Sequence, residues 1–257
     1  MHSPTQRFSD RVDFYVRSRP KYPAALLRFF QSDLGLSPLD AVADIGSGTG
    51  FLTEMFVRNG NPTFAVEPNE PMRKAAETHL GDWSNFHSIN GTAEATTLGD
   101  ASVRLVTAAQ AFHWFDAGRA ASEFRRILQP GGITAIIWNE RLNDNSPFMA
   151  AYEQLIRRYR REDEPVRSGM FREGGTPVIQ QFFGPAGYQQ CTFENPQMLD
   201  AAGLLDRITS SSYMPLPSDP AYAELVRSAT ELFDKHQQNH TVRIMHETRV
   251  YYGTIGD

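Results

Sequence analysis

Residues 41–50 read Ala-Val-Ala-Asp-Ile-Gly-Ser-Gly-Thr-Gly, and this stretch decides the fold. Its apolar first half, 41–45, predicts a short buried strand. Three glycines then alternate with small polar residues, a pattern typical of a tight turn whose backbone can approach a ligand closely. Residues 50–59 follow with apolar positions at helical spacing. A strand, a glycine turn and a helix in this order predict the first unit of an α/β fold.

The chain continues to alternate strands and helices after this unit. Further strands are expected at 63–66, 86–89, 103–108 and 133–138, and further helices at 69–80 and 116–128. This spacing predicts a Rossmann-like, doubly wound, mostly parallel sheet with helices on both faces.

The pattern differs at the two ends of the chain. Residues 8–36 look helical, with interruptions at Pro20 and Pro23. Beyond residue 140 we expect a helix at 146–162, a Gly- and Pro-rich stretch at 163–186, a strand at 188–193, helices at 196–209 and 218–238, and an antiparallel final strand at 241–252.

Composition excludes several classes of protein. The 257 residues carry 25 Lys and Arg against 30 Asp and Glu, a net charge of −5, which argues against a nucleic-acid partner. A single cysteine, Cys191, excludes a disulfide framework and a multi-cysteine zinc site, and we expect no metal. The sequence has no long apolar run, and its first residues contain no apolar segment, so we expect no secretory signal. We therefore expect a cytoplasmic, soluble protein with no membrane partner.

An acidic residue ends the second predicted strand. Glu67 follows Gly50 by 17 positions, where a carboxylate can accept both ribose hydroxyls of an adenosine. The dinucleotide fingerprint G-x-G-x-x-G/A fails, because its last position falls on Phe51 or Thr53. The loop is instead Gly-x-Gly-x-Gly with an acid two residues before it.

This loop resembles that of the class I S-adenosyl-L-methionine (SAM) dependent methyltransferases, whose signature is an acid, an apolar residue and Gly-x-Gly-x-Gly. Residues 91–94, 108–116 and 128–132, at successive strand ends, resemble the same family. Together they cover about residues 40–140 and are similar to the type-11 small-molecule branch, related to trans-aconitate methyltransferase. The resemblance implies SAM as cofactor and S-adenosyl-L-homocysteine as product.

The resemblance also implies a set of cofactor-binding residues. They are Asp44, Gly46, Ser47, Gly48, Gly50, Glu67, Pro68, Met72, Ala93, Glu94, Gln110, Ala111 and Arg19. Residues 15–23 resemble an N-terminal cap of the same branch. We expect Arg19 to pair with the SAM carboxylate, because its guanidinium fork matches a carboxylate, and Tyr15 to line the methyl-transfer site. The alternative is a surface arginine beside a core tyrosine.

His113 is the first candidate base, because it follows the fourth strand, where ligands bind in such sheets. The alternative is a histidine packed between aromatic neighbours that only shapes the pocket. We expect Trp114, Trp138 and Tyr213 to form an aromatic substrate wall, and Arg243 to meet an acidic substrate. Core packing and plain solvated charge are the competing interpretations.

The expected function is methyl transfer from SAM to a small molecule, on a carboxylate or hydroxyl oxygen. The strand-4 segment lacks the Asn/Asp-Pro-Pro-aromatic pattern of DNA amino-methyltransferases, and Cys191 is not preceded by proline. Two alternatives stay open: an NAD(P)-dependent oxidoreductase on a similar sheet, and a non-catalytic SAM-binding protein. We expect one methyltransferase domain over 1–257, with N-terminal cap helices at 1–38, a SAM-binding core at 39–140, a cap or insertion at 141–186 and the C-terminal part of the sheet at 187–257.

Overall fold

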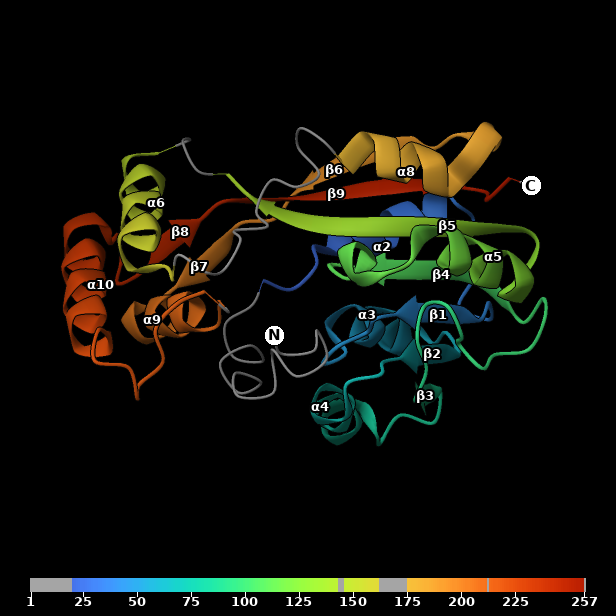
Figure 1. Ribbon diagram of the computed structural model, residues 1–257, viewed down its shortest axis with the longest axis horizontal. Coiled ribbons are helices and arrows are strands. Elements are labelled where there is room, and N and C mark those ends of the chain that lie inside the picture. Colours follow the sequence, from blue (N-terminus) through green and yellow to red (C-terminus); the bar gives the residue numbers. More distant parts are fainter. Residues whose placement is uncertain (1–19, 143–145, 162–174, 212, 257) are drawn as a thin grey trace.

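A computed structural model describes residues 20–142, 146–161, 175–211 and 213–256. Its main feature is a seven-stranded sheet in the order β3-β2-β1-β4-β5-β9-β6 (Figure 1). The strands are β1 (Val42–Ile45), β2 (Thr63–Val66), β3 (Phe86–Ile89), β4 (Val103–Ala109), β5 (Leu128–Arg141), β6 (Gln189–Glu194) and β9 (His246–Gly253). The first five pair in parallel, and β9 runs antiparallel between β5 and β6. The predicted Rossmann-like α/β fold is confirmed.

Helices cover both faces of this sheet. On one face, α2 (Ala24–Ser32) and α3 (Phe51–Asn59) bury Phe30 and Phe56 against β1, β4 and β5. On the other, α5 (Ala117–Ile127) and α8 (Gly175–Phe183) bury Phe124 and Phe182. The short η4 (Gly184–Ala186) follows α8. Of the predicted helical region 8–36, the described part contains α2.

Side-chain caps set the helix starts that the sequence predicts. Asn69 caps α4 (Glu70–Leu80) by accepting a hydrogen bond from the Met72 N–H at 3.0 Å. Asp116 caps α5 in the same way through the Arg119 N–H at 3.1 Å. Asn69 follows the end of β2, and Asp116 follows η3 (Phe112–Trp114), the short helix after β4. The two caps therefore fix where the chain turns back along the sheet.

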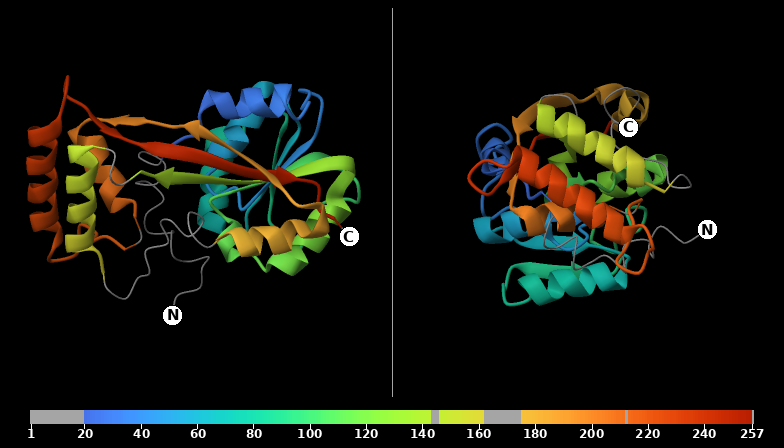
Figure 2. Two further views of the ribbon diagram at one scale, coloured as in Figure 1. Left: turned by 90° about the horizontal axis from the view of Figure 1, so that it is seen from above. Right: turned by 90° about the vertical axis from the view of Figure 1, so that its left-hand side faces the viewer.

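A second lobe lies beyond the ends of the long strands β5 and β9 (Figures 1 and 2). It consists of α6 (Pro147–Tyr159), β7 (Gln197–Leu199), α9 (Ala201–Thr209), α10 (Tyr222–His236) and β8 (Val242–Ile244). These elements share an apolar core of their own that includes Tyr152, Leu204 and Phe233. We call this unit the distal lobe. Its core combines residues of α6 with residues of the later elements β7, α9, α10 and β8. Helix α8, which lies between them in the sequence, packs on the main sheet.

Three predicted elements differ from the structure in type or extent. The expected helix 196–209 is strand β7 followed by α9, which Asp200 caps. The expected strand 241–252 is two strands, β8 and β9, because β8 leaves the main sheet to pair with β7. Strand β5 begins at Leu128, ahead of the expected start at residue 133, with a register shift before Ile133. In each case pairing with a distant strand overrides the local pattern.

No helix in the described part of the chain is long and apolar enough to cross a membrane.

Candidate active site at the carboxyl edge of the sheet

The glycine loop joins β1 to α3, and its three glycines have different surroundings. All three have left-handed backbone, with φ of +68° at Gly46, +58° at Gly48 and +86° at Gly50. A Cβ on Gly46 would lie 2.5 Å from the Ala111 Cβ, and one on Gly50 would lie 2.9 Å from the Leu80 Cδ1. A Cβ on Gly48 would meet no atom within 4 Å. The outer glycines are thus required by packing, whereas the middle one leaves its backbone open to a ligand.

Asp44 lies beneath this loop and is 1% exposed. Its carboxylate accepts hydrogen bonds from the Thr53 hydroxyl of α3 at 2.7 Å and the Thr107 hydroxyl of β4 at 3.0 Å. Burial raises the pKa of Asp44 to about 6, although the two hydroxyl donors act in the opposite direction. Asp44 therefore ties β1, α3 and β4 together under the loop. Neither threonine carries a signal in the sequence, because the sheet order is what brings them to Asp44.

Glu67 closes the other side of the loop from the end of β2. Its Oε2 accepts from the Gly48 N–H at 2.9 Å, and its Oε1 accepts from the Asn69 N–H at 2.8 Å. Burial raises the pKa of Glu67 above its ordinary value, against these two donors. Each oxygen can still accept a further hydrogen bond. Pro68, which follows Glu67, is exposed, and Met72, in the first turn of α4, is buried.

Two hydroxyl groups of the loop itself are buried without a hydrogen-bond partner among the described residues. They belong to Ser47 and Thr49. Leaving a buried hydroxyl unsatisfied costs free energy, so such groups mark places where a ligand or water supplies the partner.

The turn after β3 brings Ala93 and Glu94 to the same region. Ala93 is buried against the main core, and Glu94 is half-buried, with its Oε1 accepting from the Asp116 N–H at 2.9 Å. The turn is therefore anchored to the first turn of α5.

The end of β4 carries a strained residue. Gln110 has φ of +58°, which is rare for a residue with a side chain. Its N–H donates to the Ile137 carbonyl at 2.9 Å, and its Nε2 donates to the Asn139 carbonyl at 3.0 Å. Ala111 follows, buried against Gly46. These bonds hold the ends of β4 and β5 together and turn the chain into the next segment.

That segment is η3 (Phe112–Trp114), which carries His113. The centroid of the His113 ring lies 4.6 Å from that of Trp114 and 5.1 Å from that of Trp138. The His113 and Trp138 rings meet edge to face. The His113 ring thus contacts two of the rings predicted for the aromatic wall, and His113 is half-buried. This packing agrees with both interpretations of His113, as a base and as a wall of the site.

Four of the predicted residues remain, two of them in the distal lobe. Tyr213 packs against the core of the distal lobe, and Arg243 is exposed on β8 beside Met198. Tyr15 and Arg19 lie outside the described residues. The first described residue, Pro20, lies beside the end of β5, where its carbonyl accepts from the Asn139 side chain at 3.5 Å.

Two further arginines, Arg141 and Arg249, are held in ion pairs. The Arg141 side chain is 6% exposed, forms an ion pair with Glu153 of α6, and lies with its guanidinium 5.0 Å from the Tyr152 ring centroid. Arg249 pairs with Glu247 at 2.8 Å and lies 3.7 Å from Glu140. Arg141 therefore joins the tip of β5 to the distal lobe. Within the described residues, no group of three His, Cys, Asp or Glu could hold a metal ion.

Sequence comparison identifies the relatives of this chain. A family model for a methyltransferase domain matches residues 43–136, which span β1 to the middle of β5. An uncharacterized methyltransferase of Mycobacterium tuberculosis is 32% identical over 208 residues, covering 80% of this chain and 76% of the relative. One of Schizosaccharomyces pombe is 30% identical over 159 residues, covering 60% of each.

Solved structures share the fold. A protein from Anaeromyxobacter dehalogenans assigned to the type II methyltransferases has a TM-score of 0.68 at 24% identity, covering 92% of this chain and 98% of its own. The YcgJ protein of Bacillus subtilis has a TM-score of 0.57 at 17% identity, covering 91% and 100%. With the glycine loop and Glu67 at the carboxyl edge of a sheet of this order, the chain belongs to the class I SAM-dependent methyltransferases, enzymes that use SAM as methyl donor.

Proposed function

We propose that this enzyme methylates a small-molecule acceptor, on a carboxylate or hydroxyl oxygen, at the carboxyl edge of β1, β2, β4 and β5. One observation carries the proposal. The glycine loop offers open backbone at Gly48 and an unpartnered Ser47 hydroxyl, directly beside the Glu67 carboxylate. This donor and acceptor set suits a nucleoside with an attached polar chain.

The residues present suit SAM. Glu67 would accept the ribose hydroxyls, since both of its oxygens keep acceptor capacity beside their backbone donors. Pro68, Met72, Ala93 and Glu94 would surround the adenine, and Ser47, Gln110 and Ala111 would lie along the methionine part, with Arg19 pairing with its carboxylate. Asp44 would act through the loop that it supports, because it is buried and its oxygens are engaged by two threonines.

When bound, SAM supplies a methyl carbon that is already activated by the positive sulfonium. The tasks left to the chain are therefore alignment and exclusion of water. A carboxylate acceptor needs no base, whereas a hydroxyl needs one near neutral pH. His113 would take that proton, and Trp114 and Trp138 would pack against the acceptor.

Tyr15, and Tyr213 and Arg243 of the distal lobe, complete the proposed acceptor side. The resemblance to the branch related to trans-aconitate methyltransferase supports an acidic acceptor, for which Arg243 would be the counter-charge. The net charge of −5 supports a small molecule rather than a nucleic acid.

Calorimetric titration with SAM and with S-adenosyl-L-homocysteine tests the cofactor site. We expect dissociation constants near 1 µM, about −8 kcal/mol, and no heat with NADH. Binding of NADH without binding of SAM would overturn the proposal. A screen of small carboxylic acids and alcohols with labelled SAM then separates an enzyme from a protein that binds SAM without turnover.

A further inference from the structure

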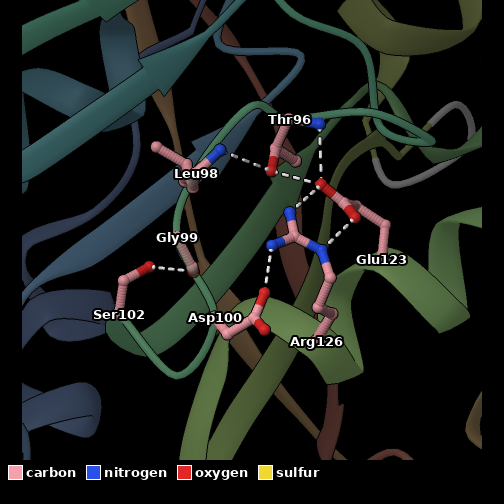
Figure 3. A network of polar contacts seen from close by, with 7 residues as sticks. All are labelled: Thr96, Leu98, Gly99, Asp100, Ser102, Glu123 and Arg126. Carbon is pink, nitrogen blue, oxygen red and sulfur yellow. Dashed lines mark hydrogen bonds and ion pairs between the residues drawn. The ribbon is translucent and has the colours of Figure 1, made fainter.

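A polar network joins the loop between β3 and β4 to helix α5. Glu123 Oε1 accepts from the Thr96 backbone N–H at 2.8 Å and from the Thr96 hydroxyl at 2.5 Å. Arg126 donates to both oxygens of Glu123, at 2.7 and 2.8 Å, and to Asp100 at 2.6 Å. Figure 3 shows the Thr96 and Arg126 donors converging on the Glu123 carboxylate, between the loop and the helix. The network holds the middle of this loop against α5.

The inner half of the network is well shielded from solvent. Thr96 is fully buried, and the Glu123 side chain is 10% exposed, whereas that of Asp100 is 80% exposed. Hydrogen bonds from Arg126 lower the pKa of Glu123 to about 2. The carboxylate is therefore ionised at neutral pH, and ionised acceptors make the stronger hydrogen bonds.

The loop that this network holds is strained. Thr97 and Ala101 have left-handed backbone, with φ of +66° and +47°. Such conformations cost free energy and persist only where the surroundings enforce them. Besides the Thr96–Glu123 bonds, the N–H groups of Ala101 and Ser102 donate to carbonyls at the end of α5, at 2.9 and 2.8 Å. The helix thus dictates the path of the loop.

The same loop carries the residues proposed to meet adenine. Ala93 and Glu94 form the tip of a turn that Thr92 and Ala95 close with two backbone hydrogen bonds, at 3.1 and 3.3 Å. The tip of this turn is held at the start of α5, because Glu94 accepts from the Asp116 N–H. The end of the turn leads directly into Thr96, which Glu123 holds one residue later.

We propose that Glu123, supported by Arg126, is a positioning residue for the adenine end of SAM. It fixes Thr96, and Thr96 fixes the turn that presents Ala93 and Glu94. A turn that is ordered before the ligand arrives loses less conformational entropy on binding. The inference rests on the proposed function, in which Ala93 and Glu94 contact the adenine and Glu123 acts only through the turn that carries them.

The test is calorimetric titration of wild-type protein and Glu123→Ala with SAM, S-adenosyl-L-homocysteine and 5′-methylthioadenosine. The last ligand shares the adenine and ribose but lacks the amino acid. Removing the carboxylate leaves two Thr96 donors without their acceptor, so we expect about tenfold weaker binding of all three ligands. Once an acceptor is known, the KM for SAM should rise by a similar factor with kcat unchanged.

Two variants serve as controls. Glu123→Gln keeps an oxygen acceptor for Thr96 and should restore most of the affinity. Asp100→Asn removes the same unit of charge from the exposed end of the network and should change affinity by less than about twofold. Thermal unfolding shows whether each variant is folded at the assay temperature. If Glu123→Ala is not, Thr96→Val removes one of the two bonds and should give a smaller loss of the same kind.

Three outcomes decide the matter. Unchanged affinity of a folded Glu123→Ala for all three ligands would overturn the positioning role. A loss confined to SAM and S-adenosyl-L-homocysteine would overturn it as well, because the effect would then lie at the amino-acid end. If the wild-type protein binds none of the three ligands, the proposed function itself fails, which is a separate result.

Discussion

Alanine substitutions in the glycine loop separate its packing from its contact with a ligand. Gly46 and Gly48 both have left-handed φ, +68° and +58°, so a side chain at either position costs about 1–2 kcal/mol for the backbone alone. At Gly46 the new Cβ would also lie 2.5 Å from the Cβ of Ala111, which is buried. Overpacking of this kind adds about 1–3 kcal/mol. We expect Gly46→Ala to lower the free energy of unfolding by about 2–5 kcal/mol, and Gly48→Ala by about 1–2 kcal/mol.

Urea unfolding measures the free energy of unfolding of each variant, and calorimetric titration measures its affinity for SAM. Gly35→Ala is the matched control, because Gly35 has φ of +68° and an added Cβ there meets no atom within 4 Å. Gly35→Ala and Gly48→Ala should be equally destabilised, but only Gly48→Ala should bind SAM more weakly, since its Cβ enters the space proposed for the ligand. The reasoning is refuted if Gly46→Ala is as stable as Gly35→Ala, or if Gly48→Ala binds SAM as the wild type does.

Three other predictions concern buried or reactive side chains. Asp44 has a pKa of about 6 in the folded protein against 3.8 ordinarily, so the folded state binds more protons between these values. Its contribution should lower the free energy of unfolding by about 2 kcal/mol as pH rises from 4 to 6, and unfolding curves of Asp44→Asn should lack this slope. Arg141→Met should destabilise the protein by about 1–3 kcal/mol, because Glu153 loses its buried partner but keeps its ion pair with Arg157 at 3.1 Å. Urea unfolding of the double variant with Glu153→Met should recover part of the loss, and full additivity would contradict the coupling. His113→Asn should abolish turnover of a hydroxyl acceptor and spare a carboxylate acceptor, whereas normal turnover of both across pH would exclude a base role.

The sequence predicted most elements of the main sheet because their signals are local. The apolar run at 41–45 and the glycines after it specify a buried strand and left-handed turns within ten residues. Asn69 and Asp116 indicate in the sequence the starts of the two helices that they cap in the structure. In the distal lobe, local signals predicted the helices α6 and α10 but missed β7. This strand has three residues, too few for a periodic pattern, and exists through its pairing with β8.

By itself, then, the sequence determined the fold class and the glycine loop, because φ preference, capping and apolar periodicity act between near neighbours. Only the tertiary structure decided which side chains hold the glycine loop and the loop between β3 and β4 in place. Thr107 bonds to Asp44 across 63 residues, and Glu123 bonds to Thr96 across 27. Such contacts depend on the order of strands in the sheet and on which helix covers which face. That order is set by the burial of apolar surface over the whole chain, so no local pattern carries it.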